Sequence, residues 1–158
     1  IDASEKNIQI AISHATNAGV SVEYQCLSAE ALLEEKKQFD VILALEVAEH
    51  VADLSVFIKA LSDLIKPGGT VILSTINRTP KSFLFAIVGA EVVLRMLPLG
   101  THQWQKFIKP SELASVFGEQ SLNITKMTGL NYNPLNGNWA LSNNMLVNYM
   151  VCAQKENI

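Results

Sequence analysis

Hydrophobic and polar positions follow a helical period in some stretches of this chain and an extended pattern in others. Apolar residues recur at helical spacing between the N-cap Ser4 and Gly19, and again in a stripe after Asp53, so we expect amphipathic helices there. A short helix is expected from about Ser28 and another over 110–117. The runs typical of strands are 20–26, 39–45, 70–76, 123–131 and 148–154.

The order of these elements predicts an α/β fold. Strands and helices alternate through the first half of the chain, which is typical of a parallel sheet with right-handed crossovers. The helix after Asp53 is expected to run to Ile65, because Pro67 cannot continue it and Gly68 permits a positive φ. The last two strands are expected to be separated by a loop rich in Asn, Gly and Pro.

The run 39–45 stands out because it is apolar without alternation. That pattern and length predict a strand buried on both faces of a sheet. It ends at Glu46, Glu49 and His50. Since ligands of open α/β sheets bind beyond the carboxyl ends of the strands, these three residues form the candidate site.

The spacing of Glu46, Glu49 and His50 allows all three side chains to face one point if a turn or helix begins there. Two carboxylates and an imidazole suit Mg²⁺ or Mn²⁺ better than a structural zinc ion. The alternative is that His50 orders the loop and no metal binds.

A second apolar segment, 82–97, has the length of a helix and carries only Glu91 and Arg95 as charged residues. It is too short to span a bilayer comfortably, so it is either a buried helix or one that lies in the membrane interface. In the second case Lys81, Arg95 and Lys106 would lie near lipid phosphates. We therefore expect one domain with an inserted lid or membrane-contact helix between about 79 and 106.

Composition narrows the classes of protein to consider. A net charge of -3 gives no electrostatic reason to expect nucleic acid as a partner. Hydrophobic residues make up 49% of the chain and charged residues 17%, which excludes disorder. Cys26 and Cys152 lie in strand-like runs, and we expect reduced core thiols of a cytosolic protein. With no signal peptide and no apolar run of about 18 residues, we expect nothing that spans a membrane.

Several motifs resemble those of the class I S-adenosylmethionine-dependent methyltransferases, and within them the ubiquinone biosynthesis O-methyltransferases. The general class is indicated by Asp2 after the end of a strand, by Glu49-His50-Val51 and by LIKPGG at 64–69. The ubiquinone branch is indicated by EVAEHV at 46–51, STINR at 74–78, GTH at 100–102, KFIKP at 106–110, GLNYNP at 129–134 and NY at 148–149.

The resemblance covers the whole chain and implies a Rossmann-like methyltransferase sheet, mostly parallel with an antiparallel last strand. The family's first strand and Gly-rich loop are absent, so residues 1–158 are expected to form an N-terminally truncated methyltransferase domain.

The resemblance also implies a site for S-adenosylmethionine. Asp2 would accept hydrogen bonds from the ribose hydroxyls, the backbone at Ser28 or Ala29 would contact the adenine, and Leu45 would pack on the cofactor. The alternatives are that Asp2 and Ser28 cap the helices that follow them and that Leu45 belongs to the core.

The implied reaction is methylation of a phenolic hydroxyl on a polyprenylated ring. A phenol has a pKa near 10, so roughly one part in a thousand is phenolate at neutral pH. The branch is associated with a divalent metal, Mg²⁺ or Mn²⁺, at Glu46, Glu49 and His50, which would favour the anion. Without a metal, His50 or His102 is the candidate base. Other small-molecule C- or N-methylation, or an inactive binding remnant that lacks the Gly-rich loop, are the alternatives.

The expected partners and location also come from the resemblance. They are a polyprenyl phenol, a membrane surface contacted through about 81–102, and other enzymes of ubiquinone biosynthesis. We expect a bacterial cytoplasmic protein peripheral to the inner membrane, or one at the matrix face of the mitochondrial inner membrane.

Overall fold

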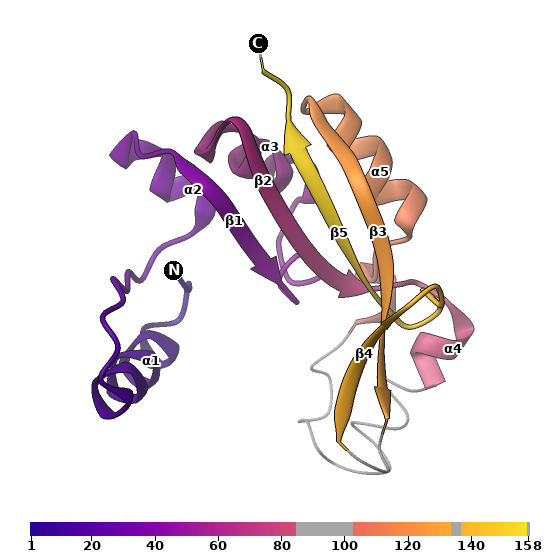
Figure 1. The fold of residues 1–158 in the computed structure, drawn as a ribbon, viewed down its shortest axis with the longest axis horizontal. Helices are drawn as coiled ribbons and strands as arrows, with labels where there is room; N and C mark the ends of the chain where they lie inside the picture. The colour runs from indigo at the N-terminus through magenta and orange to yellow at the C-terminus, as the bar shows by residue number, and fades with distance from the viewer. Residues whose placement is uncertain (85–102, 134–136, 158) are drawn as a thin grey trace.

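The protein folds around a curled five-stranded sheet with helices packed on it (Figure 1). The computed structural model describes residues 1–84, 103–133 and 137–157. The strands are β1 (Phe39–Leu45), β2 (Ile65–Ile76), β3 (Leu122–Asn133), β4 (Asn138–Ser142) and β5 (Asn148–Lys155). The helices are α1 (Glu5–Ala18), α2 (Ala29–Leu32), α3 (Leu54–Leu64), α4 (Pro80–Ser82) and α5 (Pro110–Glu119), with 3₁₀ turns η1 (Leu33–Glu35) and η3 (Trp104–Lys106).

The strand order β1-β2-β5-β3-β4 combines both kinds of pairing. β1 and β2 are parallel, whereas β5 pairs antiparallel with both β2 and β3, and β3 pairs antiparallel with β4. The α/β class is therefore confirmed, but among these strands the parallel pairing is limited to β1 and β2. β3 and β4 are consecutive in the chain and adjacent in the sheet, so a short connection reverses the chain between them, whereas β5 is inserted between β2 and β3.

Side chains at the helix starts confirm three of the predicted helices. Ser4 caps α1 by accepting a hydrogen bond from the Asn7 N–H, and Ser28 caps α2 in the same way. Asp53 accepts two N–H groups at the start of α3. Each cap satisfies backbone donors that have no partner inside the helix.

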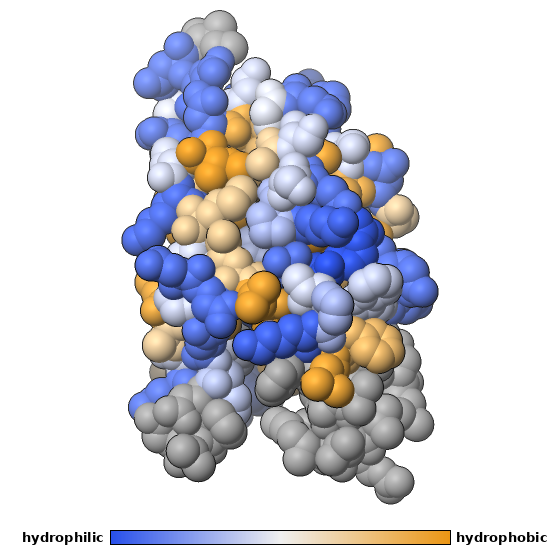
Figure 2. Space-filling view, turned by 90° about the vertical axis from the view of Figure 1, so that its right-hand side faces the viewer, coloured by the Kyte–Doolittle hydropathy of each residue, from blue (hydrophilic) through white to orange (hydrophobic). Residues whose placement is uncertain are grey.

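The core lies between the central strands and the pair α3 and α5. These two helices pack on each other and on β2 and β3, respectively. The outer surface on the right of Figure 1 mixes hydrophilic and hydrophobic residues, as expected where helices bury one face only (Figure 2). Fully buried side chains include Ile58, Leu73, Leu113, Phe117, Tyr149 and Val151.

The predicted strand at 20–26 is wrong. This segment is extended without a ladder and makes a single parallel bridge, between Asp2 and Cys26. Its apolar residues Val20 and Val22 are exposed. Alternation alone predicted a strand, but a strand also needs a neighbour to take its hydrogen bonds.

β1 has the predicted bounds but not the predicted burial. It stands at one end of the strand order, and Val41, Leu43 and Leu45 are exposed while Ala44 is buried. A continuous apolar run looks the same in sequence whether one face or both are covered.

Other differences concern boundaries and burial. α3 ends at Leu64 and β2 already begins at Ile65, so the Pro-Gly-Gly segment lies within the strand. β4 was expected to be loop. Cys26 is exposed and Cys152 half-buried, so the prediction of core thiols is wrong. Nearly all of the apolar segment 82–97 lies outside the described residues.

Candidate functional site

The candidate site begins where β1 and β2 end side by side. Leu45 pairs with Ser74 in the parallel ladder, so the next residues of each strand emerge at the same edge of the sheet. Glu46 follows Leu45 directly, and Glu49 lies one turn later. This arrangement brings the two predicted carboxylates next to the hydroxyls of Ser74 and Thr75.

Glu46 has a left-handed backbone, with φ of 54°, which is unfavourable for a residue with a side chain. Its N–H donates to the carbonyl oxygen of Ser74 at 3.0 Å and to Ser74 Oγ at 3.1 Å. Ser74 Oγ in turn donates to Glu46 Oε1 at 2.7 Å. These bonds compensate for a conformation that costs on the order of 1–3 kcal/mol and is concentrated at functional sites.

Glu49 is the most deeply buried ionisable group of the site, with 3% of its surface exposed. Thr75 Oγ1 donates to Glu49 Oε2 at 2.7 Å. Within the described part of the chain, Glu49 Oε1 is the buried side-chain oxygen or nitrogen that has no hydrogen-bond partner. Burial raises the pKa of Glu49 to about 7, the Thr75 hydrogen bond opposes that rise, and the nearby Glu46 adds to it.

The three predicted ligands are not grouped as a metal site in the described part. His50 is exposed, and residues 1–84, 103–133 and 137–157 contain no group of three or more His, Cys, Asp or Glu placed to hold a metal ion. The two glutamates offer oxygen atoms, the ligand type that hard cations take, and one buried oxygen, Glu49 Oε1, lacks a hydrogen-bond partner in the described part. The predicted set of three ligands is thus brought together only in part.

Two of the predicted cofactor residues, Asp2 and Ser28, form hydrogen bonds at the starts of the helices that follow them. The Asp2 carboxylate accepts from the Ser4 N–H at 2.7 Å and from Asn7 Nδ2 at 3.1 Å. These bonds, the Ser4 bond foremost, lower the pKa of Asp2. Ser28 Oγ accepts from the Ala31 N–H, and Ala29 is buried. Leu45 has 47% of its surface exposed, so the core alternative is wrong for it.

His102 lies outside the described residues, but segments on either side of it are held together. Trp104 Nε1 donates to the Thr79 carbonyl oxygen at 3.1 Å, and Arg78 donates to the Gln105 carbonyl oxygen at 3.1 Å. Arg78 also forms an ion pair with Glu112 of α5. The Ile108 N–H donates to the Ile76 carbonyl oxygen at 3.0 Å, so the sequence motifs at 74–78 and 106–110 meet in space.

Sequence reasoning missed several residues that shape the site. In the sequence, Ser74 and Thr75 stand out only as part of the motif at 74–78. Two consecutive hydroxyl residues at the end of a buried strand are a signal that could have identified them as site residues. Tyr149 is fully buried, and its hydroxyl donates to the Ile108 carbonyl oxygen at 3.0 Å. Burial, with Glu112 and Glu49 nearby, raises the pKa of Tyr149 well above its usual value.

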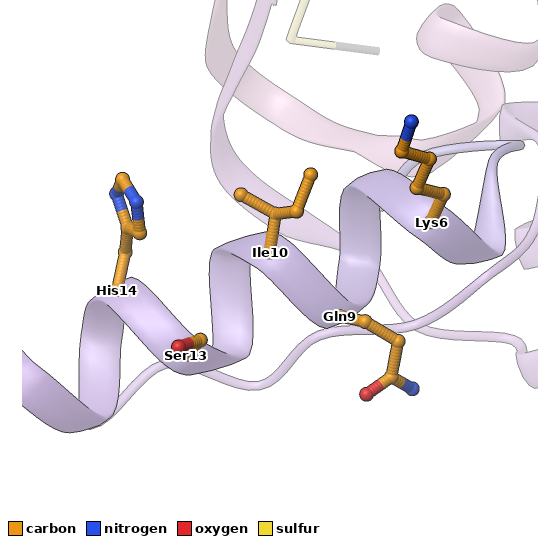
Figure 3. Close-up of a pocket in the computed structure, with 5 residues that line it drawn as sticks. All are labelled: Lys6, Gln9, Ile10, Ser13 and His14. Carbon is orange, nitrogen blue, oxygen red and sulfur yellow. The ribbon is translucent and has the colours of Figure 1, made fainter.

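A hollow on α1 is unrelated to this site. Figure 3 shows Lys6, Ile10 and His14 on one side of the helix, with Gln9 and Ser13 beside them. All five side chains come from this single helix, so the hollow does not combine groups from different elements.

Comparison with known proteins finds similar sequences that share one name. The chain is 47% identical over 150 residues to "Ubiquinone biosynthesis O-methyltransferase" of Pelagibacter ubique, which covers 95% of this chain and 62% of the relative. It is 48% identical over 157 residues to the protein of the same name from Mesorhizobium japonicum, covering 99% of this chain and 63% of the relative. The chain is thus similar over nearly its whole length to proteins named ubiquinone biosynthesis O-methyltransferase. It spans slightly less than two thirds of their length.

The chain shares its fold with solved methyltransferase structures. A family described as "Methyltransferase domain" matches residues 1–73. A SAM-dependent methyltransferase from Methanosarcina mazei superposes with a TM-score of 0.68 at 17% identity, covering 99% of this chain and 81% of that one. Magnesium protoporphyrin IX methyltransferase from Synechocystis PCC 6803 superposes with a TM-score of 0.64 at 16% identity, covering 98% of this chain and 61% of that one. The Rossmann-like methyltransferase fold is confirmed.

Proposed function

We propose that the protein containing this chain transfers a methyl group from S-adenosylmethionine to a phenolic hydroxyl of a polyprenylated ring in ubiquinone biosynthesis. The observation that carries the proposal is the identity of 46% to 48% to relatives of that name over 95% to 99% of the chain. A pair of carboxylates at the carboxyl ends of parallel strands supports it, since ligands of such sheets bind there.

For the methyl donor, we assign Asp2 to the ribose hydroxyls, the backbone at Ser28 and Ala29 to the adenine, and Leu45 to packing against the cofactor. The exposure of Leu45 at the end of β1 supports its assignment. Asp2 retains acceptor capacity, because a carboxylate has about four lone-pair sites and local bonds use only part of them.

For the reaction, the protein has to align the acceptor oxygen with the methyl group and favour its deprotonated form. Ser74 and Thr75 each donate a hydrogen bond to one of the two glutamates, Glu46 and Glu49, and Glu49 Oε1 is a buried acceptor without a hydrogen-bond partner in the described part. A divalent cation such as Mg²⁺ bound by these carboxylates would favour the phenolate. Without a cation, His50 or His102 remains the proposed base.

The proposed substrate resides in a bilayer, so the protein has to reach a membrane surface. We propose that it does so through residues around 81–102, most of which lie outside the described part. In the described part no helix is long and apolar enough to cross a membrane. The proposed location is the cytoplasmic face of a bacterial inner membrane or the matrix face of the mitochondrial one, beside other enzymes of the pathway.

The test is a methyl-transfer assay on the intact protein with labelled S-adenosylmethionine and a short-chain prenylated phenol. Mass spectrometry and NMR of the product are expected to place one methyl group on oxygen. Glu49→Gln is expected to lower kcat at least 10-fold, whereas Glu119→Gln, at the exposed end of α5, leaves it unchanged. Methylation on carbon or nitrogen, or none with any prenylated phenol, would contradict the proposal.

A chelator arm of the same assay tests the metal. If Glu46 and Glu49 hold a cation, EDTA abolishes transfer and Mg²⁺ or Mn²⁺ restores it. Full activity in EDTA would show that the deprotonation depends on His50 or His102 instead.

A further inference from the structure

Two consecutive hydroxyls of β2 each hold one glutamate of the candidate site. Ser74 Oγ donates to Glu46 Oε1 and Thr75 Oγ1 donates to Glu49 Oε2, both at 2.7 Å. Both hydroxyl residues are buried, at 2% and 0% exposure. Because consecutive residues of a strand point to opposite faces, neither hydroxyl can replace the other.

The direction of each hydrogen bond follows from counting protons. A hydroxyl has one proton and two acceptor lone pairs. Ser74 Oγ accepts from the Glu46 N–H, so its own proton is available to the Glu46 carboxylate. Thr75 can likewise give its proton to Glu49 Oε2, which leaves Glu49 Oε1 without a partner.

The same contacts determine where the carboxylates lie. Ser74 Oγ bonds to both the backbone and the side chain of Glu46, and these bonds stabilise the left-handed φ of that residue. Thr75 fixes one oxygen of a carboxylate that is otherwise surrounded by protein. Each hydroxyl thus limits the rotation of a side chain that would have other rotamers available.

We infer that Ser74 and Thr75 are positioning residues for methyl transfer, each holding one glutamate of the proposed site, Glu46 or Glu49, in a fixed orientation. This inference rests on the proposed function, in which the two glutamates act. Neither hydroxyl touches the substrate, and both act through the carboxylates. Groups that orient a catalytic residue commonly affect rate by about 10- to 100-fold when removed.

The decisive variants are Thr75→Val, which keeps the shape and removes the donor, and Thr75→Ser, which keeps the donor. In the intact protein we expect Thr75→Val to lower kcat about 10- to 100-fold. The KM for the methyl donor and its calorimetric Kd are expected to change less than about two-fold, because the positioned group is not part of the cofactor site. Thr75→Ser is expected to recover most of kcat.

Thr128→Val is the matched control, because Thr128 also donates its hydroxyl to an oxygen, that of the Ser142 carbonyl, but lies on β3. It should leave kcat unchanged. If Thr75→Val does not fold, Ser74→Ala with the same measurements replaces it. Equal kcat in Thr75→Val and wild type, or equal loss in Thr75→Val and Thr75→Ser, would overturn the inference alone. An inactive wild type would overturn the proposed function, and the inference with it.

Discussion

Asp2 has a structural role at the start of α1 that is compatible with its proposed binding role. Its carboxylate organises the start of α1 through the Ser4 N–H and Asn7, and these bonds keep its pKa low, so it is anionic at neutral pH. An anionic acceptor is also what two ribose hydroxyls require. The two roles are compatible because the carboxylate has more lone pairs than its local partners use.

Asp2→Asn in the intact protein is expected to weaken binding of S-adenosylmethionine. A hydrogen bond to a charged group contributes about 1.5–3 kcal/mol, so losing the charge should raise the calorimetric Kd at least 10-fold. Ser4→Ala is the control, since it removes the cap on the Asn7 N–H but leaves the carboxylate. If Ser4→Ala weakens binding equally, Asp2 serves α1 and not the cofactor.

Residues at the site differ in how far the sequence could predict them. Glu46 and Glu49 could be placed because they follow an apolar run, and strand ends of this fold form the ligand crevice. The exposure of His50 could not be predicted from the sequence, because it depends on the path of the turn after Glu46. The Thr75 hydroxyl donates a hydrogen bond to Glu49, which is 26 positions away in sequence, and a local sequence pattern cannot predict such a contact.

At the scale of elements, capping residues and apolar periodicity predicted the helices well. Whether an extended segment forms a strand depended on its pairing with another segment. α1, α2 and α3 begin at the expected caps because those signals are local. The strand expected at 20–26 has only a bridge, whereas β4 is formed by pairing with β3, from Asn138 opposite Asn133 to Ser142 opposite Gly129. Whether an extended segment becomes a strand depends on a distant partner, which a local pattern does not contain.

β3 and the segment 143–147 meet at Gly129. A Cβ at this position would lie 1.9 Å from the Asn144 carbonyl oxygen and 2.5 Å from its carbon. The segment cannot easily move away, because Asn77 Nδ2 donates to the Met145 carbonyl oxygen and Thr79 Oγ1 to that of Leu146. Glycine is therefore required where this backbone crosses β3.

Gly129→Ala is expected to destabilise the intact protein by about 1–3 kcal/mol, the usual cost of overpacking. Gly118→Ala in α5 is the control, because nothing lies within 4 Å of the added Cβ. There alanine should be neutral or stabilise by up to about 1 kcal/mol through its helix propensity. Urea unfolding monitored by circular dichroism measures both, and equal midpoints for the two variants would contradict the packing argument.

For the whole molecule, the sequence correctly indicated the α/β fold class but only part of the order and direction of the strands. The alternation of helices and strands is enough to predict an α/β sheet. It could not show that β5 lies between β2 and β3, because that order depends on which edges meet after the chain has reversed. The consequence for function is that Ile76, at the end of β2, and Asn148, at the start of β5, are 72 positions apart in sequence but pair at one side of the sheet.

That side of the molecule also carries α4, which leads to the proposed membrane contact. Phe83 and Leu84 follow α4 with 44% and 57% of their surfaces exposed, and the Phe83 ring lies edge-on to Trp104 with centroids 6.4 Å apart. Burying an apolar side chain of this size contributes about 1.5–3 kcal/mol. We therefore expect the intact protein to co-sediment with anionic liposomes, and the double variant Phe83→Glu, Leu84→Glu to lose at least 10-fold in partitioning.

The control for this prediction is Val56→Glu on α3, which replaces a side chain that is 53% exposed and should partition like wild type. Circular dichroism of each variant separates loss of binding from loss of fold, and a wild-type protein that stays in the supernatant would show that these residues do not contact lipid.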